Sequence, residues 1–420
     1  MKIGTAAFIL LAAAPCAFAQ PPAAPPGAAP ARMAPIVSPE IAADGRVTFR
    51  LRAPNATAVY VSGIGRPAAP AAPPAAAPAA PAAGGRGGGL RLDMAKNDQG
   101  VWSATTPDPM PPGIYQYTFN VDGLRIADPG NNRFQTGFNS ASSSRLVVPG
   151  GLWTPAPGIA RGAVTRHFVH SAIAGDDRDF WVYTPPGYDP ARKEPYPVLF
   201  LLHGLGDEAN SWMENGAANV ILDNLIAQGK AKPMLMVNTL GYGYPNGPAG
   251  AMRPGMLENF SKIVLTEVLP IVEQRYHVAK TPAMRAIAGL SMGGAEATFI
   301  GLNHLETFGY VGSFSGAYVM WPDAVPPGAS GPGGPRQLST EAVAKVFPAL
   351  DAKANTRLKL LWTTCGTADS LVGVNRNFRD WLDAKGVRNT YIEVPDIGHV
   401  WPFWRQNLAD FAPLLFQPAK

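Results

Sequence analysis

Cysteine is nearly absent from the sequence: Cys16 and Cys365 are the only two in 420 residues. Cys16 lies in an N-terminal segment that we expect to be removed, which leaves a single thiol in the exported chain. One thiol cannot form an internal disulfide, so a disulfide-stabilised scaffold is excluded and packing must stabilise the fold. The sequence also has no HExxH motif, no two cysteines at metal-ligand spacing and no cluster of acidic residues, so it predicts no metal site and no cofactor.

Charge is scarce as well. Asp, Glu, Lys and Arg together make up 15% of the residues, and the formal net charge of +5 at pH 7 is spread without blocks of Lys or Arg. A nucleic-acid-binding protein would concentrate its basic residues, so nucleic acid is excluded as a partner. After the N-terminal segment no apolar run is long enough to cross a bilayer, and we expect no membrane association once that segment is removed.

The N-terminal segment has the pattern of a secretory signal. Lys2 precedes an apolar run of about a dozen residues, and Ala17-Phe18-Ala19 forms a small-residue cleavage site. Lipid attachment at Cys16 is the alternative, but Pro15 is a poor residue directly before a lipidated cysteine. We therefore expect residues 1–19 to be removed and the protein to be secreted or periplasmic.

Proline and alanine dominate two tracts that cannot form a core. Residues 20–39 form a Pro/Ala linker, and residues 66–89 form an insert that we expect to be a long loop without regular structure. Around that insert, residues 40–150 contain runs in which apolar and polar residues alternate between turn signals. This pattern predicts antiparallel strands in an all-β, immunoglobulin-like sandwich. The runs are RVTFRLR (46–52), TAVYVSG (57–63), GIYQYTFNVDG (113–123) and SSRLVVPG (143–150).

The pattern changes at about residue 165, where strand-like and helix-like stretches begin to alternate and continue to residue 418. Such alternation predicts a mostly parallel sheet with helices on both faces. The expected strands are 196–204, 233–241, 284–291, 310–316, 357–366 and 389–395, and the expected helices include 258–276, 293–305 and 374–386.

A serine lies at the sharpest point of this region. The stretch RAIAGLSMGGAEATFIGL (285–302) places Ser291 in a Gly-x-Ser-x-Gly turn between an expected strand and an expected helix. Flanking glycines relieve the crowding around a serine in such a strained turn, as an exposed nucleophile requires. A plain tight turn is the alternative. Because a serine hydroxyl needs a base, and the base needs an acid partner, the rest of the chain decides between the two.

Six histidines can supply the base. His399, in VPDIGHVWPFW, lies in the loop between the last strand and the last helix, where an α/β-hydrolase carries its base. His203 follows the first long strand, in LLHGLGDE, and we expect it to brace that loop. The other four have structural or surface positions: His167, His170, His277 and His304.

The acid partner is expected after the strand that lies between the serine and the histidine. Asp369, in TTCGTADSL, has that place. Asp396 is the competitor, but it shares a short loop with His399 and is too close to reach the far ring nitrogen. The chain order Ser291, Asp369, His399 is that of α/β-hydrolases, so the sequence predicts that fold and a nucleophilic serine.

Acyl transfer also needs N–H donors for the developing oxyanion. The N–H of Met292, directly after the nucleophile, is one. The stretch HGLGD (203–207) follows an early strand, and Gly204 allows a close approach, so we assign the N–H of Leu205 as the second.

Several motifs together resemble the esterase-D-like branch of carbohydrate esterase family one. They are HGLGD, GAANVILDNLIAQGKAKPM, AIAGLSMGGAEA, CGTADSL and GHVWPFWRQNLADFAPLLF, and the resemblance covers residues 165–418. It implies a feruloyl or acetylxylan esterase that releases side groups from plant xylan. The stretch GVWSATTPDPMPPGIYQYTFNVDGLRIADPGNN resembles an early-set, glycogen-binding-module-like domain, which implies either carbohydrate binding or a packing role.

Aromatic residues near the expected triad bear on the substrate. Trp321 and Trp401, with Trp404 nearby, would line a cleft suited to a phenolic acyl group, and core positions are the alternative for the last two. The expected partner is an ester-substituted polysaccharide or oligosaccharide, feruloyl in preference to acetyl. A siderophore esterase and a non-catalytic polysaccharide-binding protein are the rival interpretations, and the oligomeric state is left open.

Overall fold

The computed structural model describes residues 35–64, 89–138, 143–251, 253–324 and 337–417. The expected export signal, most of the Pro/Ala linker and nearly all of the Pro/Ala insert lie outside these residues. Residues Val37–Lys420 form one compact unit.

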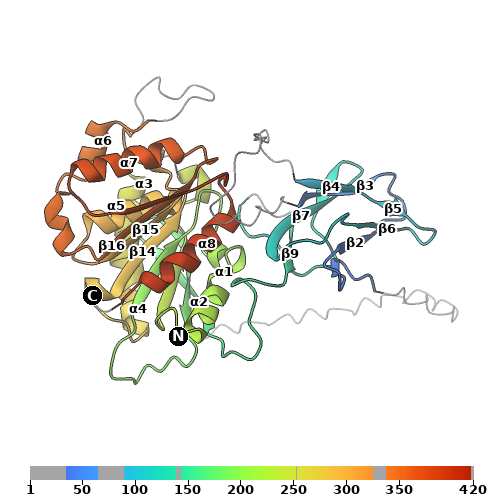
Figure 1. The fold of residues 1–420 in the computed structure, drawn as a ribbon, viewed down its shortest axis with the longest axis horizontal. Helices are drawn as coiled ribbons and strands as arrows, with labels where there is room; N and C mark the ends of the chain where they lie inside the picture. The colour runs from blue at the N-terminus through green and yellow to red at the C-terminus, as the bar shows by residue number, and fades with distance from the viewer. Residues whose placement is uncertain (1–34, 65–88, 139–142, 252, 325–336, 418–420) are drawn as a thin grey trace, which may run out of the picture. The chain divides into compact units, whose positions relative to one another are not determined.

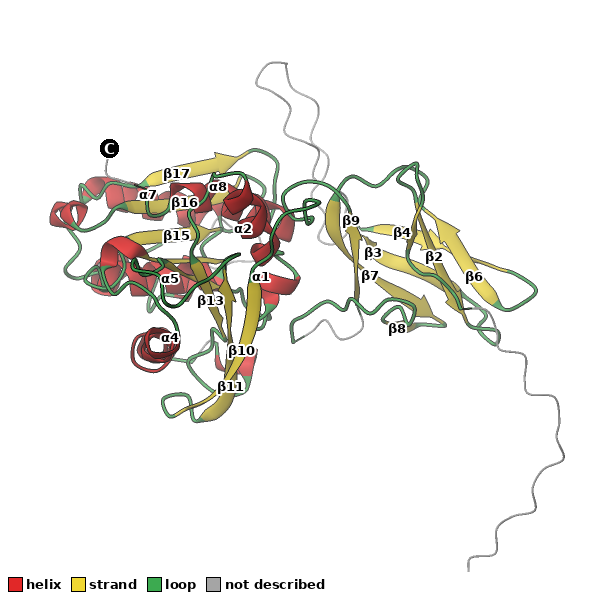
Figure 2. Ribbon diagram, turned by 90° about the horizontal axis from the view of Figure 1, so that it is seen from below, coloured by secondary structure: helices red, strands yellow, loops and turns green. Residues whose placement is uncertain are grey.

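The N-terminal strands form two antiparallel sheets (Figures 1 and 2). Alternate residues of β2 are buried, because successive side chains of a strand point to opposite faces. The apolar faces share one core, in which Phe49, Tyr117 and Phe119 are fully buried. The first sheet has the order β1 (Glu40–Ile41), β2 (Val47–Arg52), β6 (Val101–Thr105), β5 (Ala95–Lys96); the second has the order β4 (Leu90–Asp93), β3 (Val59–Ile64), β7 (Gly113–Val121), β8 (Leu124–Ile126), with β9 (Ser144–Val148) paired to β7.

An eight-stranded mixed sheet forms the centre of the C-terminal part (Figure 2). Its strands from β13 to β17 pair in parallel, and an antiparallel hairpin, β10–β11, extends one edge. All six strands expected from the alternating pattern are present, so the prediction of a mostly parallel sheet is confirmed. In sheet order the strands are β10 (Ala163–Ser171), β11 (Asp176–Thr184), β13 (Leu235–Thr239), β12 (Val198–Leu202), β14 (Arg285–Leu290), β15 (Tyr310–Phe314), β16 (Leu360–Gly366) and β17 (Thr390–Val394).

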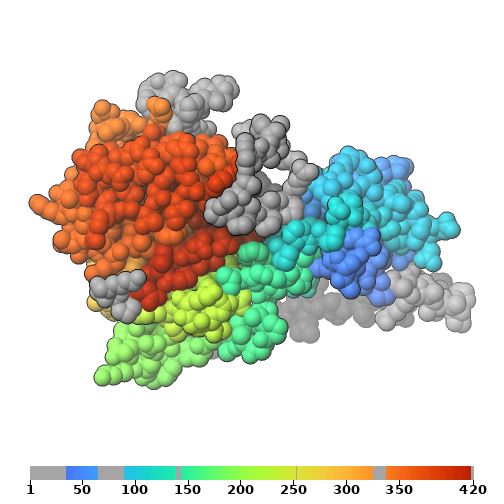
Figure 3. Space-filling model, viewed as in Figure 1, coloured from blue at the N-terminus to red at the C-terminus, as the bar shows by residue number. Residues whose placement is uncertain are grey.

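Helices cover both faces of this sheet. Leu199 and Leu201 of β12 pack in one core with α2 and α8, while Val198 and Phe200 pack in the other with α3, α5 and α7. Figure 3 shows α8, in dark red, beside the yellow-green α2 on the surface. The expected helix at 258–276 is interrupted by a π-helical segment, Ile263–Val268. The helices are α1 (Ser211–Glu214), α2 (Ala218–Ala227), α3 (Met256–Lys262), α4 (Leu269–Arg275), α5 (Met292–Asn303), α6 (Thr340–Val346), α7 (Val372–Ala384) and α8 (Trp401–Phe411).

The carboxyl ends of the parallel strands lie at one edge of the sheet, which positions the candidate site. Ser291 follows β14, Asp369 follows β16 and His399 follows β17. His203 follows β12 at the same edge. In open α/β sheets, ligands bind beyond the carboxyl ends of the strands, so the four loops are where a site is expected.

Candidate active site

Ser291 occupies a strained turn between β14 and α5. Its backbone has φ +52° and ψ −115°, a conformation that costs a non-glycine residue about 1–3 kcal/mol. Two neighbouring glycines make the turn possible. A Cβ at Gly289 would lie 2.3 Å from the Gly293 carbonyl oxygen, and a Cβ at Gly293 would lie 2.5 Å from the His203 carbonyl oxygen. No larger residue fits at either position, which is the physical reason for the Gly-x-Ser-x-Gly spacing.

Ser291, His399 and Asp369 form a continuous hydrogen-bonded relay. The Nε2 atom of His399 is 2.9 Å from Ser291 Oγ, and its Nδ1 atom is 2.7 Å from Asp369 Oδ2. Since a carboxylate only accepts, Nδ1 carries the proton and Nε2 is free to accept the serine proton. The Asp369 side chain is fully buried, whereas His399 is about one-third exposed and accessible to a substrate.

The environment of Asp369 keeps it ionised. Burial raises the pKa of this carboxyl, but the hydrogen bond and charge of His399, together with the Leu371 N–H, lower it by more. The Leu371 N–H donates to Asp369 Oδ1 at 2.9 Å. The net pKa of Asp369 is therefore below its ordinary value of 3.8, as a group that orients a histidine and stabilises its cation requires.

Asp396, the other acid considered for this role, takes no part in the relay. It is exposed, adopts φ +57° in the turn after β17, and its N–H donates to Thr367 Oγ1 at 2.9 Å. The turn that it forms directs the chain from β17 toward His399.

The loop Gly204–Asp207 approaches the serine closely. A Cβ on Gly204 would lie 2.6 Å from Leu290 Cδ1 and 3.4 Å from Ser291 Cβ, so the loop passes within contact distance of the serine. The loop carries Leu205, and Met292 begins α5 on the other side of the serine. Both N–H groups assigned from the sequence thus belong to segments that adjoin Ser291.

His203 braces this loop from behind. It is buried, its Nδ1–H donates to the Gly204 carbonyl at 2.8 Å, and its Nε2 accepts the Gly241 N–H at 2.9 Å. Burial lowers the pKa of His203 to about 4, so the ring is neutral at physiological pH. Both nitrogens are occupied, and His203 has no free position from which to act as a base.

Trp321 is not a substrate-binding residue, and this prediction is wrong. Its side chain is 2% exposed and packs in the core, stacked on Tyr318 with ring centroids 4.4 Å apart. Its indole N–H donates to the Ala295 carbonyl of α5 at 3.1 Å. A short 3-10 turn after β15, Tyr318–Met320, directs the tryptophan inward between α5 and α7, which sequence periodicity alone does not reveal.

Two tryptophans of α8 lie beside the relay. Trp404 is buried, and its ring meets the His399 ring edge to face at 4.8 Å, which restricts the imidazole. Trp401 is half-buried. Its ring centroid lies 5.4 Å from that of Trp404 and 5.2 Å from that of Trp212, with the rings edge to face in both pairs. Trp404 is therefore a core residue in contact with the histidine ring, whereas Trp401 is only partly buried.

Two acidic side chains near the relay were not anticipated from the sequence. Burial raises the pKa of Asp207 to about 7, although the Gly204 backbone and Ser211 act in the opposite direction. Glu296 of α5 is fully buried, burial raises its pKa well above 4.5, and within the described residues neither of its carboxyl oxygens has a hydrogen-bond partner. No local sequence signal marks either residue, because their burial results from the packing of distant segments.

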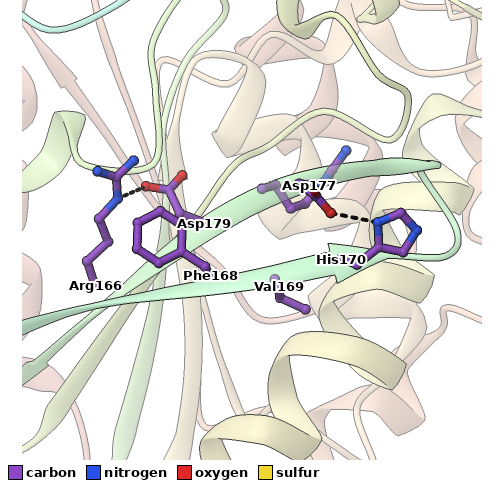
Figure 4. Close-up of a pocket in the computed structure, with 7 residues that line it drawn as sticks. Arg166, Phe168, Val169, His170, Asp177 and Asp179 are labelled. Carbon is purple, nitrogen blue, oxygen red and sulfur yellow. Dashed lines mark hydrogen bonds and ion pairs between the residues drawn. The ribbon is translucent and has the colours of Figure 1, made fainter. Parts of the chain in front are cut away.

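A separate pocket of about 420 Å³ lies on the β10–β11 hairpin (Figure 4). Arg166 pairs with Asp179 at 2.6 Å and His170 pairs with Asp177 at 2.7 Å. None of Ser291, His399 and Asp369 lines this pocket.

Across the described residues there is no group of three His, Cys, Asp or Glu residues placed to hold a metal. The helices of the same residues include none with the length and apolar character of a membrane span.

Comparison with known proteins assigns the chain to a family. Residues 171–415, more than half of the chain, match the family model described as "Putative esterase". The chain belongs to this esterase family. This assignment agrees with the hydrogen-bonded arrangement of Ser291, His399 and Asp369.

Two curated relatives of the esterase are similar in sequence. It is 30% identical over 388 residues, 90% of this chain, to the endo-1,4-beta-xylanase/feruloyl esterase of Xylanibacter ruminicola. It is also 30% identical over 209 residues, 47% of this chain, to endo-1,4-beta-xylanase Y of Acetivibrio thermocellus. The chain spans 46% and 18% of the lengths of these two relatives.

Solved structures confirm the α/β-hydrolase fold of the esterase. The CE1 ferulic acid esterase of Anaeromyces mucronatus aligns with a TM-score of 0.52 and 23% identity over 64% of this chain and 96% of that one. The enterobactin esterase of Shigella flexneri aligns with a TM-score of 0.55 and 19% identity over 87% of this chain and 92% of that one.

Proposed function

We propose that this esterase hydrolyses feruloyl esters on a plant cell-wall polysaccharide such as xylan, with acetyl as the alternative acyl group. The observation that carries ester hydrolysis is the relay from Ser291 through His399 to Asp369, with distances of 2.9 and 2.7 Å. The feruloyl and xylan parts rest on the sequence relative from Xylanibacter ruminicola, whose similarity covers 90% of this chain.

The proposed reaction is a two-step acyl transfer. His399 Nε2 takes the proton of Ser291 Oγ as that oxygen attacks the ester carbonyl carbon, and the carbonyl oxygen becomes an oxyanion. The Leu205 and Met292 N–H groups bind the oxyanion, and the start of α5 adds the positive end of a helix dipole.

The tetrahedral intermediate then collapses. His399 returns the proton to the leaving alcohol oxygen, and the acyl group remains on Ser291. Water, deprotonated by His399, attacks the acyl carbon and releases the acid, and the proton returns to Ser291. Asp369 holds the ring and stabilises its cation in both steps.

A siderophore esterase is the second candidate function, favoured by the fold likeness to the enterobactin esterase over 87% of this chain. A trilactone with anionic catechols favours a strongly basic cleft, whereas the basic residues of this chain are spread without blocks of Lys or Arg. The dispersed charge therefore supports the feruloyl or acetyl substrate over the siderophore.

Export and the role of the N-terminal sheets belong to the same proposal. The signal-like segment supports secretion or a periplasmic location, and the two antiparallel sheets around one core support an immunoglobulin-like domain. A polysaccharide outside the cell is a substrate that a protein in such a location can reach.

The test is a comparison of rates on methyl ferulate, an acetylated xylo-oligosaccharide, a catecholate trilactone and p-nitrophenyl acetate, with Ser291→Ala as the control. We expect methyl ferulate to be turned over fastest among the first three and all activity to vanish in the control. A preference for the acetylated sugar would change the proposed acyl group from feruloyl to acetyl. A preference for the trilactone would establish the siderophore esterase, the second candidate. Undiminished activity of Ser291→Ala would refute the mechanism.

A further inference from the structure

The loop Gly204–Asp207 is held in place by hydrogen bonds on several of its peptide groups. The Gly206 N–H donates to the Tyr242 hydroxyl at 2.9 Å, and that hydroxyl donates to the Asp207 carbonyl at 3.1 Å. The Gly204 carbonyl accepts from His203, as described above, and from the Asp207 N–H at 3.1 Å. All of these partners belong to the part of the chain that matches the esterase family.

One further hydrogen bond on this loop comes from outside that part. The Gly206 carbonyl accepts the backbone N–H of Phe138 at 2.9 Å. Phe138 lies between β8 and β9 of the N-terminal sheets, well before the family match begins at residue 171. The residue after Leu205 is therefore fixed on its N–H by Tyr242 and on its carbonyl by Phe138.

The Phe138 ring reinforces this contact. It meets the Tyr242 ring edge to face, with centroids 5.8 Å apart and an interplanar angle of 83°. It also lies over Gly247, where an added Cβ would be 2.4 Å from the Phe138 Cζ atom. The missing side chain at residue 247 is what admits the ring, and an edge-to-face pair of this kind adds specific attraction beyond simple burial.

The same N-terminal segment also binds helix α1, which directly follows the loop. The Asn215 side chain pairs with the Thr136 backbone, donating to its carbonyl at 3.1 Å and accepting from its N–H at 3.4 Å. The Arg145 guanidinium of β9 donates to the backbone and side-chain oxygens of Glu214. Contacts from Thr136 and Phe138, which connect β8 to β9, and from Arg145 of β9 thus converge on the loop and on the end of α1.

We propose that Phe138 is a positioning residue for ester hydrolysis, and that it acts by holding the Gly204–Asp207 loop where its Leu205 N–H meets the oxyanion. The proposal rests on the proposed function in one respect, the oxyanion role of Leu205. It makes the N-terminal sheets part of the catalytic apparatus, in addition to any role in binding a polysaccharide.

The test uses the full chain and p-nitrophenyl acetate, a substrate too small to need a distant binding surface. Phe138→Ala removes the ring that anchors the segment, and Phe134→Ala is the matched control. Phe134 belongs to the same segment and is similarly exposed, at 51% against 46% for Phe138. We expect Phe138→Ala to lower kcat about 10- to 100-fold with KM little changed, and Phe134→Ala to leave both unchanged.

Gly247→Ala gives a second approach from the family part of the chain. Its new Cβ would displace the Phe138 ring, so kcat should fall in the same direction. In the Phe138→Ala background the ring is gone, and Gly247→Ala should cost much less than it does alone. Equal costs in both backgrounds would mean that the substitution acts through its own backbone strain, at φ +56°, and would count against the proposal.

The outcomes separate this proposal from the proposed function. A Phe138→Ala enzyme with unchanged kcat, or with only a raised KM for methyl ferulate, overturns the positioning role while ester hydrolysis stands. A lower melting temperature with unchanged kcat at 25 °C shows a structural role alone and also overturns it. An unmodified chain without Ser291-dependent turnover of p-nitrophenyl acetate overturns both.

Discussion

Replacement of Asp369 by asparagine is the sharpest test of the relay. The carboxylate is fully buried and 2.7 Å from His399 Nδ1, so it meets the imidazole without touching the substrate. An amide has nearly the same shape but no charge, and its NH₂ group can pair with the wrong histidine tautomer, in which Nε2 carries the proton and cannot accept another.

The size of the effect follows from the charge pair. Two unit charges about 4 Å apart at an effective dielectric constant of about 20 interact by about 4 kcal/mol, and this attraction is present only once His399 is protonated in the transition state. At 1.36 kcal/mol per tenfold change, the loss is about 10³ in kcat, and the misplaced tautomer adds to it. We therefore expect a loss of about 10³- to 10⁴-fold in kcat, with KM nearly unchanged.

The assay is the initial rate on p-nitrophenyl acetate, with Asp396→Asn as the matched control. Asp396 lies three residues before His399 and is exposed. Among the hydrogen bonds of the described residues, none joins Asp396 to the imidazole. Its replacement should leave kcat within about twofold. If Asp396→Asn were the damaging change, or Asp369→Asn retained most of the activity, the assignment of the acid and the reasoning from burial and distance would both be wrong.

Three further predictions concern stability and reactivity. Trp321→Ala should lower the free energy of unfolding in urea by about 3–5 kcal/mol, because the side chain is a core residue, and a loss below 1 kcal/mol would contradict that placement. Cys365 is fully buried and burial raises its thiol pKa, so Ellman's reagent should label it only after denaturation; rapid labelling of the folded chain would refute this. Because burial raises the pKa of Asp207 to about 7 from 3.8, the folded chain retains a proton that the unfolded chain releases, and the contribution of Asp207 to stability falls as pH rises through that range. Asp207→Asn should therefore raise the melting temperature more at pH 8 than at pH 5, and an equal change at both would exclude this titration.

Local sequence signals predicted the strands, and they predicted that Ser291, Asp369 and His399 lie together, because each signal has a local physical cause. Buried parallel strands need continuous apolar runs, and the runs at 196–204 and 284–291 became β12 and β14. The turn at Ser291 needs glycine on both sides, since a Cβ at Gly289 or Gly293 would clash with backbone atoms. Chain order along a parallel sheet then assigned Asp369 and His399, because successive loops at the carboxyl edge lie close together.

The orientation of the aromatic residues could not be predicted in the same way. Trp321 was expected in the cleft and is in the core, since one short turn after β15 reverses the direction of its side chain. The sequence places Trp404 near the histidine loop, but its edge-to-face contact with His399 depends on how α8 packs on the sheet. Periodicity shows which residues are apolar, and it does not show which apolar residue reaches a given site.

The sequence by itself predicted the strands of the mostly parallel sheet, the glycine-flanked turn at Ser291, the grouping of Ser291 with Asp369 and His399, and the loop that adjoins the serine. These follow from steric and chemical requirements that act over a few residues or through the order of elements along the chain. Only the tertiary structure decided the burial of Asp207 and Glu296, the core position of Trp321, and the contact of Phe138 with Gly206. Each of these depends on segments tens of residues apart that meet only after folding, and no local pattern in the sequence records such a meeting.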